Sequence, residues 1–296
     1  MPLVKIFCEI DDFCKDFFKQ FKFNLLTNGK NMRKRSFKMK PSEIMTIVLW
    51  YPYSGYKTFK DYYEKHVLVH MQNDFNNLVS YNRFLELRNS LTMPLLIFSQ
   101  LRSQAAPCTE ISYIDSYPLK ISHTRRESSH KTFKEIATKG KTSVGWFYGF
   151  KLHVVINHLG QILSFCITPG NVADNNAQVL TKLTKRISGK LYGDKGYIVN
   201  PKLFESLYTK GVHLITKIRS NMKNKLISMA DKFYLKKRGV VESVGAILKE
   251  DLSLEHSRHR SFWGFICHIA TVVAAYDFRD KKPGISVPDT PGFKIA

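Results

Sequence analysis

The stretch Ile111-Ser112-Tyr113-Ile114-Asp115-Ser116-Tyr117-Pro118 places one carboxylate, that of Asp115, inside an apolar run. β-Branched and aromatic residues of this kind favour a β-strand. A charged group in such a run requires an explanation, because acids are rarely buried without a partner. Asp194 and Glu242 also stand in short runs of apolar residues and glycine. We interpret these three acids as parts of one site.

Five strand-like runs can be recognised beyond residue 108. They cover residues 111–117, 148–157, 161–167, 190–194 and 212–218. The second and third are joined by the hairpin-like turn Asn157-His158-Leu159-Gly160. Helical patterns at residues 174–186 and 201–209 separate the later runs. Three strands followed by alternating helix and strand predict an α/β fold: a mixed five-stranded sheet with flanking helices.

The first hundred residues have helical periodicity instead. Helices are predicted at residues 3–23, from Pro41 to about Pro52, from about Thr58, and at residues 81–88 with Ser80 as the N-cap. The pattern changes near residues 105–108. We therefore expect three parts: a small helical, DNA-binding domain at 1–107, the sheet domain at 108–280, and a tail without fixed structure at 281–296.

The charge of the chain predicts a polyanionic partner. Forty-six Lys and Arg against 24 Asp and Glu give a formal net charge of +22, which is typical of proteins that bind nucleic acid. The longest apolar run, Phe262 to Tyr276, is too short to span a bilayer and is expected to form a buried helix. No secretory signal is evident at the N-terminus, so we expect no membrane partner and a cytoplasmic protein. The five cysteines form no CxxC pair and are expected to be reduced thiols.

Two groups of basic residues are candidates for DNA contact. The connection between the first two strands is unusually long and basic, which favours phosphate contact; partial disorder without DNA is the alternative. Its candidates are Arg125, Arg126, Lys131, Lys134, Lys139 and Lys141. If the helix at residues 81–88 enters a DNA groove, Arg83 and Arg88 are candidates there. An ordinary helix with a solvated face is the alternative. For Trp263, its apolar neighbours favour a core position over stacking on a base.

The three acids fit the ligand preferences of Mg²⁺, which takes oxygen ligands and retains several waters. Two such ions about 4 Å apart can activate an attacking oxygen and stabilise a leaving one. Each acid has a structural alternative: Asp115 a strand-end backbone bond, Asp194 a turn, and Glu242 a solvated salt bridge. Arg238 precedes Glu242 by four residues and Lys249 follows it by seven, so one helix face would carry all three.

The residues resemble the DDE-type transposases of bacterial insertion sequences. The likeness is carried by Ile114-Asp115-Ser116 with Pro118, Gly170-Asn171-Val172 with Asp174, Asp194-Lys195-Gly196-Tyr197, and Arg238 with Glu242 and Lys249. The last three match the spacing R-x3-E-x6-K of the family, whereas the family's tyrosine position holds Leu235, with Tyr234 beside it.

This resemblance implies an RNase H-like catalytic domain that follows the helical domain in the sequence. It implies that Asp115, Asp194 and Glu242 are the catalytic residues and hold two Mg²⁺ ions, with Mn²⁺ as a substitute. Arg238 and Lys249 would bind phosphates near the cut. The gap of 79 residues from Asp115 to Asp194 fits two further strands and a helix, and the gap of 48 from Asp194 to Glu242 leaves no room for a large inserted domain.

The resemblance also implies an activity. A metal-dependent endonuclease and transposase would hydrolyse double-stranded DNA at the terminal inverted repeats of an insertion sequence. It would then transfer the freed 3′ hydroxyls to target DNA. Such DNA recombination implies a homodimer or larger assembly on DNA, in the bacterial cytoplasm near the nucleoid. Two alternatives remain: an RNase H-like nuclease without strand transfer, and a catalytically silent, transposase-derived regulator.

Overall fold

The computed structural model describes residues 3–20, 38–142, 144–218, 222, 226–255 and 259–288. The chain divides into two compact units. The helical unit comprises residues 1–99, 251–253 and 262–280, and the sheet unit comprises residues 100–250, 254–261 and 281–296.

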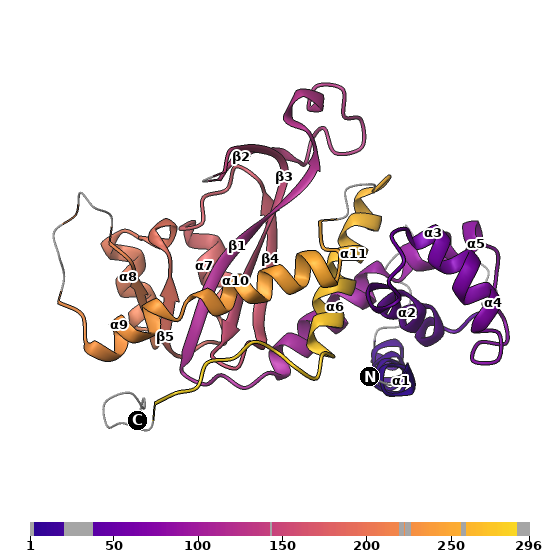
Figure 1. Ribbon diagram of the computed structural model, residues 1–296, viewed down its shortest axis with the longest axis horizontal. Helices are drawn as coiled ribbons and strands as arrows, with labels where there is room; N and C mark the ends of the chain where they lie inside the picture. The colour runs from indigo at the N-terminus through magenta and orange to yellow at the C-terminus, as the bar shows by residue number, and fades with distance from the viewer. Residues whose placement is uncertain are drawn as a thin grey trace. The chain divides into compact units, whose positions relative to one another are not determined.

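The sheet unit is built on a mixed sheet (Figure 1). Its strands are β1 (Ile111–Ser122), β2 (Thr138–Lys141), β3 (Trp146–Asn157), β4 (Ile162–Pro169), β5 (Gly189–Gly193) and β6 (Val212–Thr216). The order is β2-β3-β1-β5-β6, with β4 also paired to β3. β1 runs antiparallel to β3 and parallel to β5, which is parallel to β6. The predicted α/β class and mixed sheet are confirmed, and the short β2 is a sixth strand beyond the five expected.

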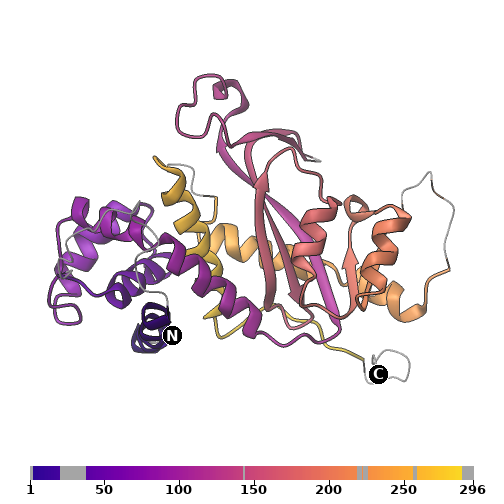
Figure 2. The same ribbon diagram turned by 180° about the vertical axis from the view of Figure 1, so that it is seen from behind.

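Helices cover both faces of this sheet (Figures 1 and 2). α7 (Ala177–Leu183) packs on the face that carries Ile114 and Val155. α10 (Gly239–Ala246) packs on the opposite face, against Tyr117. The unit also contains α8 (Pro201–Tyr208) and α9 (Met229–Lys236). α7 begins later than predicted, because Asn176 caps it by accepting hydrogen bonds from the backbone N–H groups of its first turn, and it ends at Leu183.

The helical unit confirms the helical periodicity of the N-terminal region. It contains α1 (Leu3–Gln20), α2 (Pro41–Trp50), α3 (Phe59–Tyr62), α4 (Leu68–His70), α5 (Tyr81–Ser90) and α11 (Phe262–Asp277). A π-helical turn, Tyr63–Val67, connects α3 to α4, and α6 (Thr92–Ala105) crosses from this unit into the sheet unit. The predicted start at Thr58 is correct, since its hydroxyl accepts from the N–H of Asp61. Ser80 holds the N-cap position of α5 in extended backbone, but its side chain makes no capping bond to that described helix.

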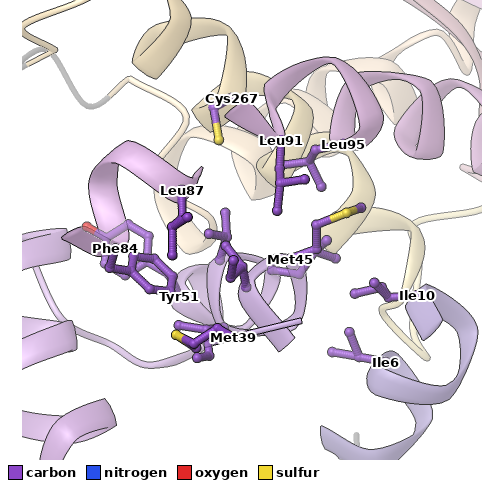
Figure 3. Packing of buried hydrophobic residues seen from close by; sticks show 14 of the residues in the cluster. Ile6, Ile10, Met39, Met45, Tyr51, Phe84, Leu87, Leu91, Leu95 and Cys267 are labelled. Atoms are coloured by element: carbon purple, nitrogen blue, oxygen red, sulfur yellow. The ribbon is translucent and has the colours of Figure 1, made fainter. Parts of the chain in front are cut away.

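The core of the helical unit gathers side chains from segments far apart in the chain (Figure 3). Ile6 and Ile10 of α1, Met45 of α2 and Leu91 are buried in it. Cys267 of α11 belongs to the same cluster.

α11 therefore packs with the N-terminal helices, whereas the expected boundary grouped residues 262–280 with the sheet. Its sequence could not reveal this, because almost every residue from Gly264 to Tyr276 is buried and the helix has no polar face to orient it. Trp263, for which a core position was expected, is 51% exposed at the start of the helix.

Part of the tail has a fixed place in the sheet unit. The backbone N–H of Ile285 donates to the carbonyl of His158 over 2.8 Å. Gly160 has a φ of +74°, and a Cβ there would lie 1.9 Å from the carbonyl oxygen of Pro283. Residues 281–288 form no helix or strand, but this backbone contact joins them to the β3–β4 turn; residues 289–296 lie outside the described residues. Within the described ranges, no helix has the length and apolar character needed to cross a membrane.

Candidate active site

Asp115 lies near the middle of β1, on the face covered by α10. Its side chain is 20% exposed, and its Oδ2 accepts from a guanidinium nitrogen of Arg238 over 3.3 Å. Burial raises the pKa of Asp115 to about 6, against an ordinary value of 3.8. Arg238 lowers this pKa, while the negative charge of Asp194 raises it. Asp115 is therefore a carboxylate whose ionised form is disfavoured by its surroundings.

Strand register places Asp194, which directly follows β5, beside Asp115. β1 and β5 are parallel neighbours, and Tyr113 pairs with Tyr192. Asp115 and Asp194 are each two residues beyond this pair and therefore lie close together. This proximity explains why the charge of Asp194 raises the pKa of Asp115. The Asp194 carboxylate also accepts from the N–H of Gly196 over 2.7 Å. The predicted turn at Asp194 is thus real, and it holds the carboxylate in place.

The guanidinium of Arg238 contacts both Glu242 and Asp115. One guanidinium nitrogen of Arg238 donates to Glu242 over 2.7 Å, while the other contacts Asp115. The side chain of Arg238 is 13% exposed and that of Glu242 is 62% exposed. The four-residue spacing on α10 thus brings Arg238 and Glu242 together, and Arg238 stands between two of the predicted acids.

The position of α10 is set by close contact with Tyr117. The Tyr117 hydroxyl donates to the carbonyl of Val241 over 2.5 Å. A Cβ on Gly245 would lie 2.4 Å from the Tyr117 ring, so only glycine permits this approach. Lys249 follows in a π-helical turn, Ile247–Asp251; its Nζ lies 5.9 Å from the centre of the Tyr117 ring and pairs with Glu255 at 2.9 Å.

A fourth acid, Asp174, lies beside these residues. Its Oδ1 accepts from Lys151 over 3.0 Å and from the Ser116 hydroxyl over 2.9 Å. A Cβ on Gly196 would lie 3.0 Å from Asp194 Oδ1 and 3.4 Å from Asp174 Oδ2, so both carboxylates border this glycine. The sequence around Lys151 does not predict the ion pair between Lys151 and Asp174. The one sequence feature that points to Asp174 is its place just after Gly170-Asn171-Val172, a motif shared with the transposase family.

Tyr197 is buried beside the same acids. The Ser116 hydroxyl, which donates to Asp174, lies close enough to the Tyr197 hydroxyl to lower its pKa. Burial, followed by the charges of Asp115, Asp174 and Asp194, raises the pKa of Tyr197 well above its ordinary value. The phenol therefore stays protonated and adds a donor to this site.

The predicted basic residues occupy different settings. The candidates at Arg125, Arg126, Lys131, Lys134, Lys139 and Lys141 are all exposed. Lys139 pairs with Glu127 at 2.5 Å. In the helical unit, Arg83 is exposed and pairs with Glu86 at 2.5 Å. Arg88 is half-buried, with its guanidinium 5.3 Å from the centre of the Phe59 ring, so much of its side chain is used in packing. Other basic residues of the segments 21–37 and 219–225 fall partly or wholly outside the described residues.

A metal at this site would have oxygen donors available. Asp115 and Asp194 are adjacent, and the cost of burying the Asp115 charge is the kind that a cation relieves. As the side chains stand, however, no three Asp, Glu, His or Cys residues of the described chain form a group that could hold a metal ion. The residues present fit a divalent cation in chemical type, and Arg238 currently engages two of them.

One of the comparisons with known proteins identifies a family. The family model described as "Transposase DDE domain" matches residues 105–262. No curated protein matches the chain. Two solved structures, the Mos1 strand transfer complex and the Mos1 transposase paired-end complex with left transposon end, are each 14% identical. Both alignments cover 90% of this chain and 87% and 88% of those chains, with TM-scores of 0.24 and 0.25, too low to support an argument. On the family match, which spans more than half of the sequence and includes Asp115, Asp194 and Glu242, the chain belongs to the transposase DDE-domain family.

Proposed function

We propose that the protein is a DNA transposase that cuts phosphodiester bonds at the ends of an insertion sequence and transfers the 3′ hydroxyl ends to target DNA by a two-metal mechanism. The observation that supports the proposal is the proximity of Asp115 to Asp194 and, through Arg238, to Glu242. Asp115 and Asp194 are neighbours through strand register, and Arg238 connects Asp115 to Glu242. Family membership supports the same activity.

Asp115, Asp194 and Glu242 are the proposed ligands of two Mg²⁺ ions, for which Mn²⁺ can substitute. When bound, such ions supply an activated nucleophilic oxygen and stabilise the leaving oxygen. The chain contributes carboxylates held by different elements: Asp194 by the N–H of Gly196, Asp115 by β1, and Glu242 by α10. Burial disfavours an unpaired negative charge on Asp115, which favours any state in which a cation accompanies it.

Arg238 has one proposed role before a metal binds and another after it has bound. Without metal its guanidinium neutralises Asp115 and Glu242. With Asp115 and Glu242 holding a divalent cation, the guanidinium of Arg238 would be available to bind a phosphate, which matches its planar fork of donors. Lys249, one turn beyond the end of α10 and over the Tyr117 ring, is the second proposed phosphate ligand.

DNA is the proposed partner of the exposed basic surface. The six cations between β1 and β3 are all exposed, and exposed Lys and Arg supply affinity and register without reading sequence. The terminal repeats would be read by the helical unit, where Arg83 is the more accessible of the two candidates on α5. Cutting and joining two ends together implies two or more copies of the chain on DNA.

The test is product analysis with labelled DNA that carries the element ends. In Mg²⁺ or Mn²⁺ we expect nicks at the ends and, from a pre-cut end, strand-transfer products. Asp194→Asn should abolish both products and leave end binding nearly intact. Lys195→Ala, which changes the neighbouring exposed side chain and keeps the carboxylate, is the matched control.

Two results would replace the proposal. Cleavage without strand transfer would indicate a nuclease of the RNase H-like type. End binding without cleavage would indicate a silent DNA-binding regulator. The second alternative has one observation in its favour, namely the engagement of Asp115 and Glu242 by Arg238 in the present arrangement.

A further inference from the structure

The end of the β2–β3 hairpin carries a tryptophan on the surface. Trp146 begins β3 and pairs with Lys141 at the end of β2. It is 63% exposed, whereas the next two residues of the strand, Phe147 and Tyr148, are buried. Strand alternation alone does not account for this difference, because Tyr148 lies on the same face as Trp146.

Lys141 lies on the Trp146 ring. Its Nζ is 5.6 Å from the ring centre, a distance at which a cation is attracted to the indole face. The contact restrains the indole without burying it. An aromatic ring that is already ordered loses little conformational freedom when it binds a flat partner.

Positive charge continues along the hairpin from this ring. Lys139 pairs with Tyr148, two residues from the tip, and its ion pair with Glu127 connects the hairpin to the loop before it. Residues 123–146 hold six Lys and Arg against two acids. The loop is fixed to the hairpin: Phe133 is fully buried, and its carbonyl accepts from the Tyr148 hydroxyl over 3.1 Å. The hairpin therefore presents the Trp146 ring in contact with Lys141, with Lys139 two residues further along β2, in a segment that carries a net positive charge.

We propose that Trp146 stacks on an unpaired base of DNA, with Lys141 and its basic neighbours binding the adjacent phosphates. Surfaces that combine aromatic rings with positive charge are those that bind single-stranded nucleic acid. Bases inside a duplex are already stacked and paired, so the ring prefers an end with unpaired nucleotides, where no unpairing energy is needed. This inference rests on the proposed function for its choice of DNA as the polyanion.

The experiment compares two DNAs in binding titrations. One is a blunt duplex, and the other is the same duplex with four unpaired nucleotides at one 3′ end. Trp146→Ala should weaken binding of the overhang about tenfold, as expected for the loss of one base–aromatic stack, and change blunt-duplex binding by less than about twofold. Trp146→Phe keeps a ring and should restore most of the loss.

Two further readouts separate stacking from charge. Tryptophan fluorescence should be quenched by the overhang in the wild type, and this quenching should be lost in Trp146→Phe. Trp146→Ala should leave the salt dependence of binding unchanged, whereas Lys141→Met should reduce the slope by about one. Val144→Ala removes exposed apolar atoms from the same turn and should bind both DNAs as the wild type does.

Several outcomes would overturn the inference. Trp146→Ala could bind the overhang as well as the wild type, or lose both DNAs equally. It could also change the oligomeric state with DNA binding unaltered, which would make the tip a protein contact. In these cases the proposed function survives. Failure of the wild type to bind either DNA would instead remove the proposed function together with this inference.

Discussion

Asp115→Asn should stabilise the metal-free protein while abolishing its activity. A pKa of about 6, against the ordinary 3.8, means that the folded chain binds the Asp115 proton more tightly than the unfolded chain does. Between these values the folded state carries more protons, so stability falls as the pH rises through the window. The cost reaches about 3 kcal/mol above pH 6 and is about 1 kcal/mol at pH 4.5. Asparagine cannot ionise and avoids this cost.

The measured quantity is the free energy of unfolding in urea, with a chelator present, at pH 4.5 and pH 8. The attraction of Arg238 for the Asp115 carboxylate is already included in the pKa of Asp115, whereas any change in packing caused by the substitution acts equally at both pH values. The difference between the two pH values is therefore the sharper readout. The stabilisation by Asp115→Asn should grow by about 2 kcal/mol from pH 4.5 to pH 8.

Glu242→Gln is the matched control, because it removes the other carboxylate from the same guanidinium. The Glu242 side chain is 62% exposed, so this change should alter stability by no more than about 0.5 kcal/mol at either pH. A constant effect of Asp115→Asn across the two pH values, or a loss of stability at pH 8, would refute the argument that burial sets the protonation of Asp115.

Three further changes test the surroundings of the site. Lys151→Met removes the buried cation from Asp174 and should lower the free energy of unfolding by about 2–4 kcal/mol in urea titrations, whereas an unchanged midpoint would show that the pair is solvated. Gly245→Ala places a methyl against the Tyr117 ring and should cost about 1–3 kcal/mol, with normal stability counting against the described approach of α10. Arg238→Met should tighten Mn²⁺ binding, measured by electron paramagnetic resonance, because the competing cation is gone; weaker binding would mean that Arg238 does not compete.

Much of the site could be predicted, because the sequence around each acid indicates the strand or helix on which that acid lies. The apolar run around Asp115 and the glycines flanking Asp194 mark a strand and a strand end, and the spacing of Arg238 and Glu242 marks a helix. The spacing of these two residues also predicts their contact, since residues four apart on a helix are neighbours.

The Lys151 and Asp174 pair could not be predicted, because it depends on which residues of β1 and β3 lie opposite each other. Ser116 pairs with His153, and Pro118 with Lys151, so the lysine reaches the loop after β4 from the middle of the sheet. A shift by one residue would move the lysine to the other face, and no local pattern fixes that register.

Two helices were missed for different reasons. Proline near the start of α6 hides its beginning, although a proline in the first turn is compatible with a helix. α9 follows a basic segment, and its start depends on the Ser228 hydroxyl, which accepts from the N–H of Asp231. The place of α11 among the N-terminal helices depends on packing between distant segments, which local periodicity does not encode.

The central claim is that three separated carboxylates share one cation site, and Mn²⁺ binding tests it most directly. Titrations followed by electron paramagnetic resonance would compare the wild type with Asp115→Asn, Asp194→Asn and Glu242→Gln, each shown to be folded. We expect each substitution to weaken Mn²⁺ binding by about tenfold or more, as loss of one charged ligand should. Wild-type affinity in any one of the three would contradict the claim, most clearly in Glu242→Gln, whose carboxylate is held by Arg238.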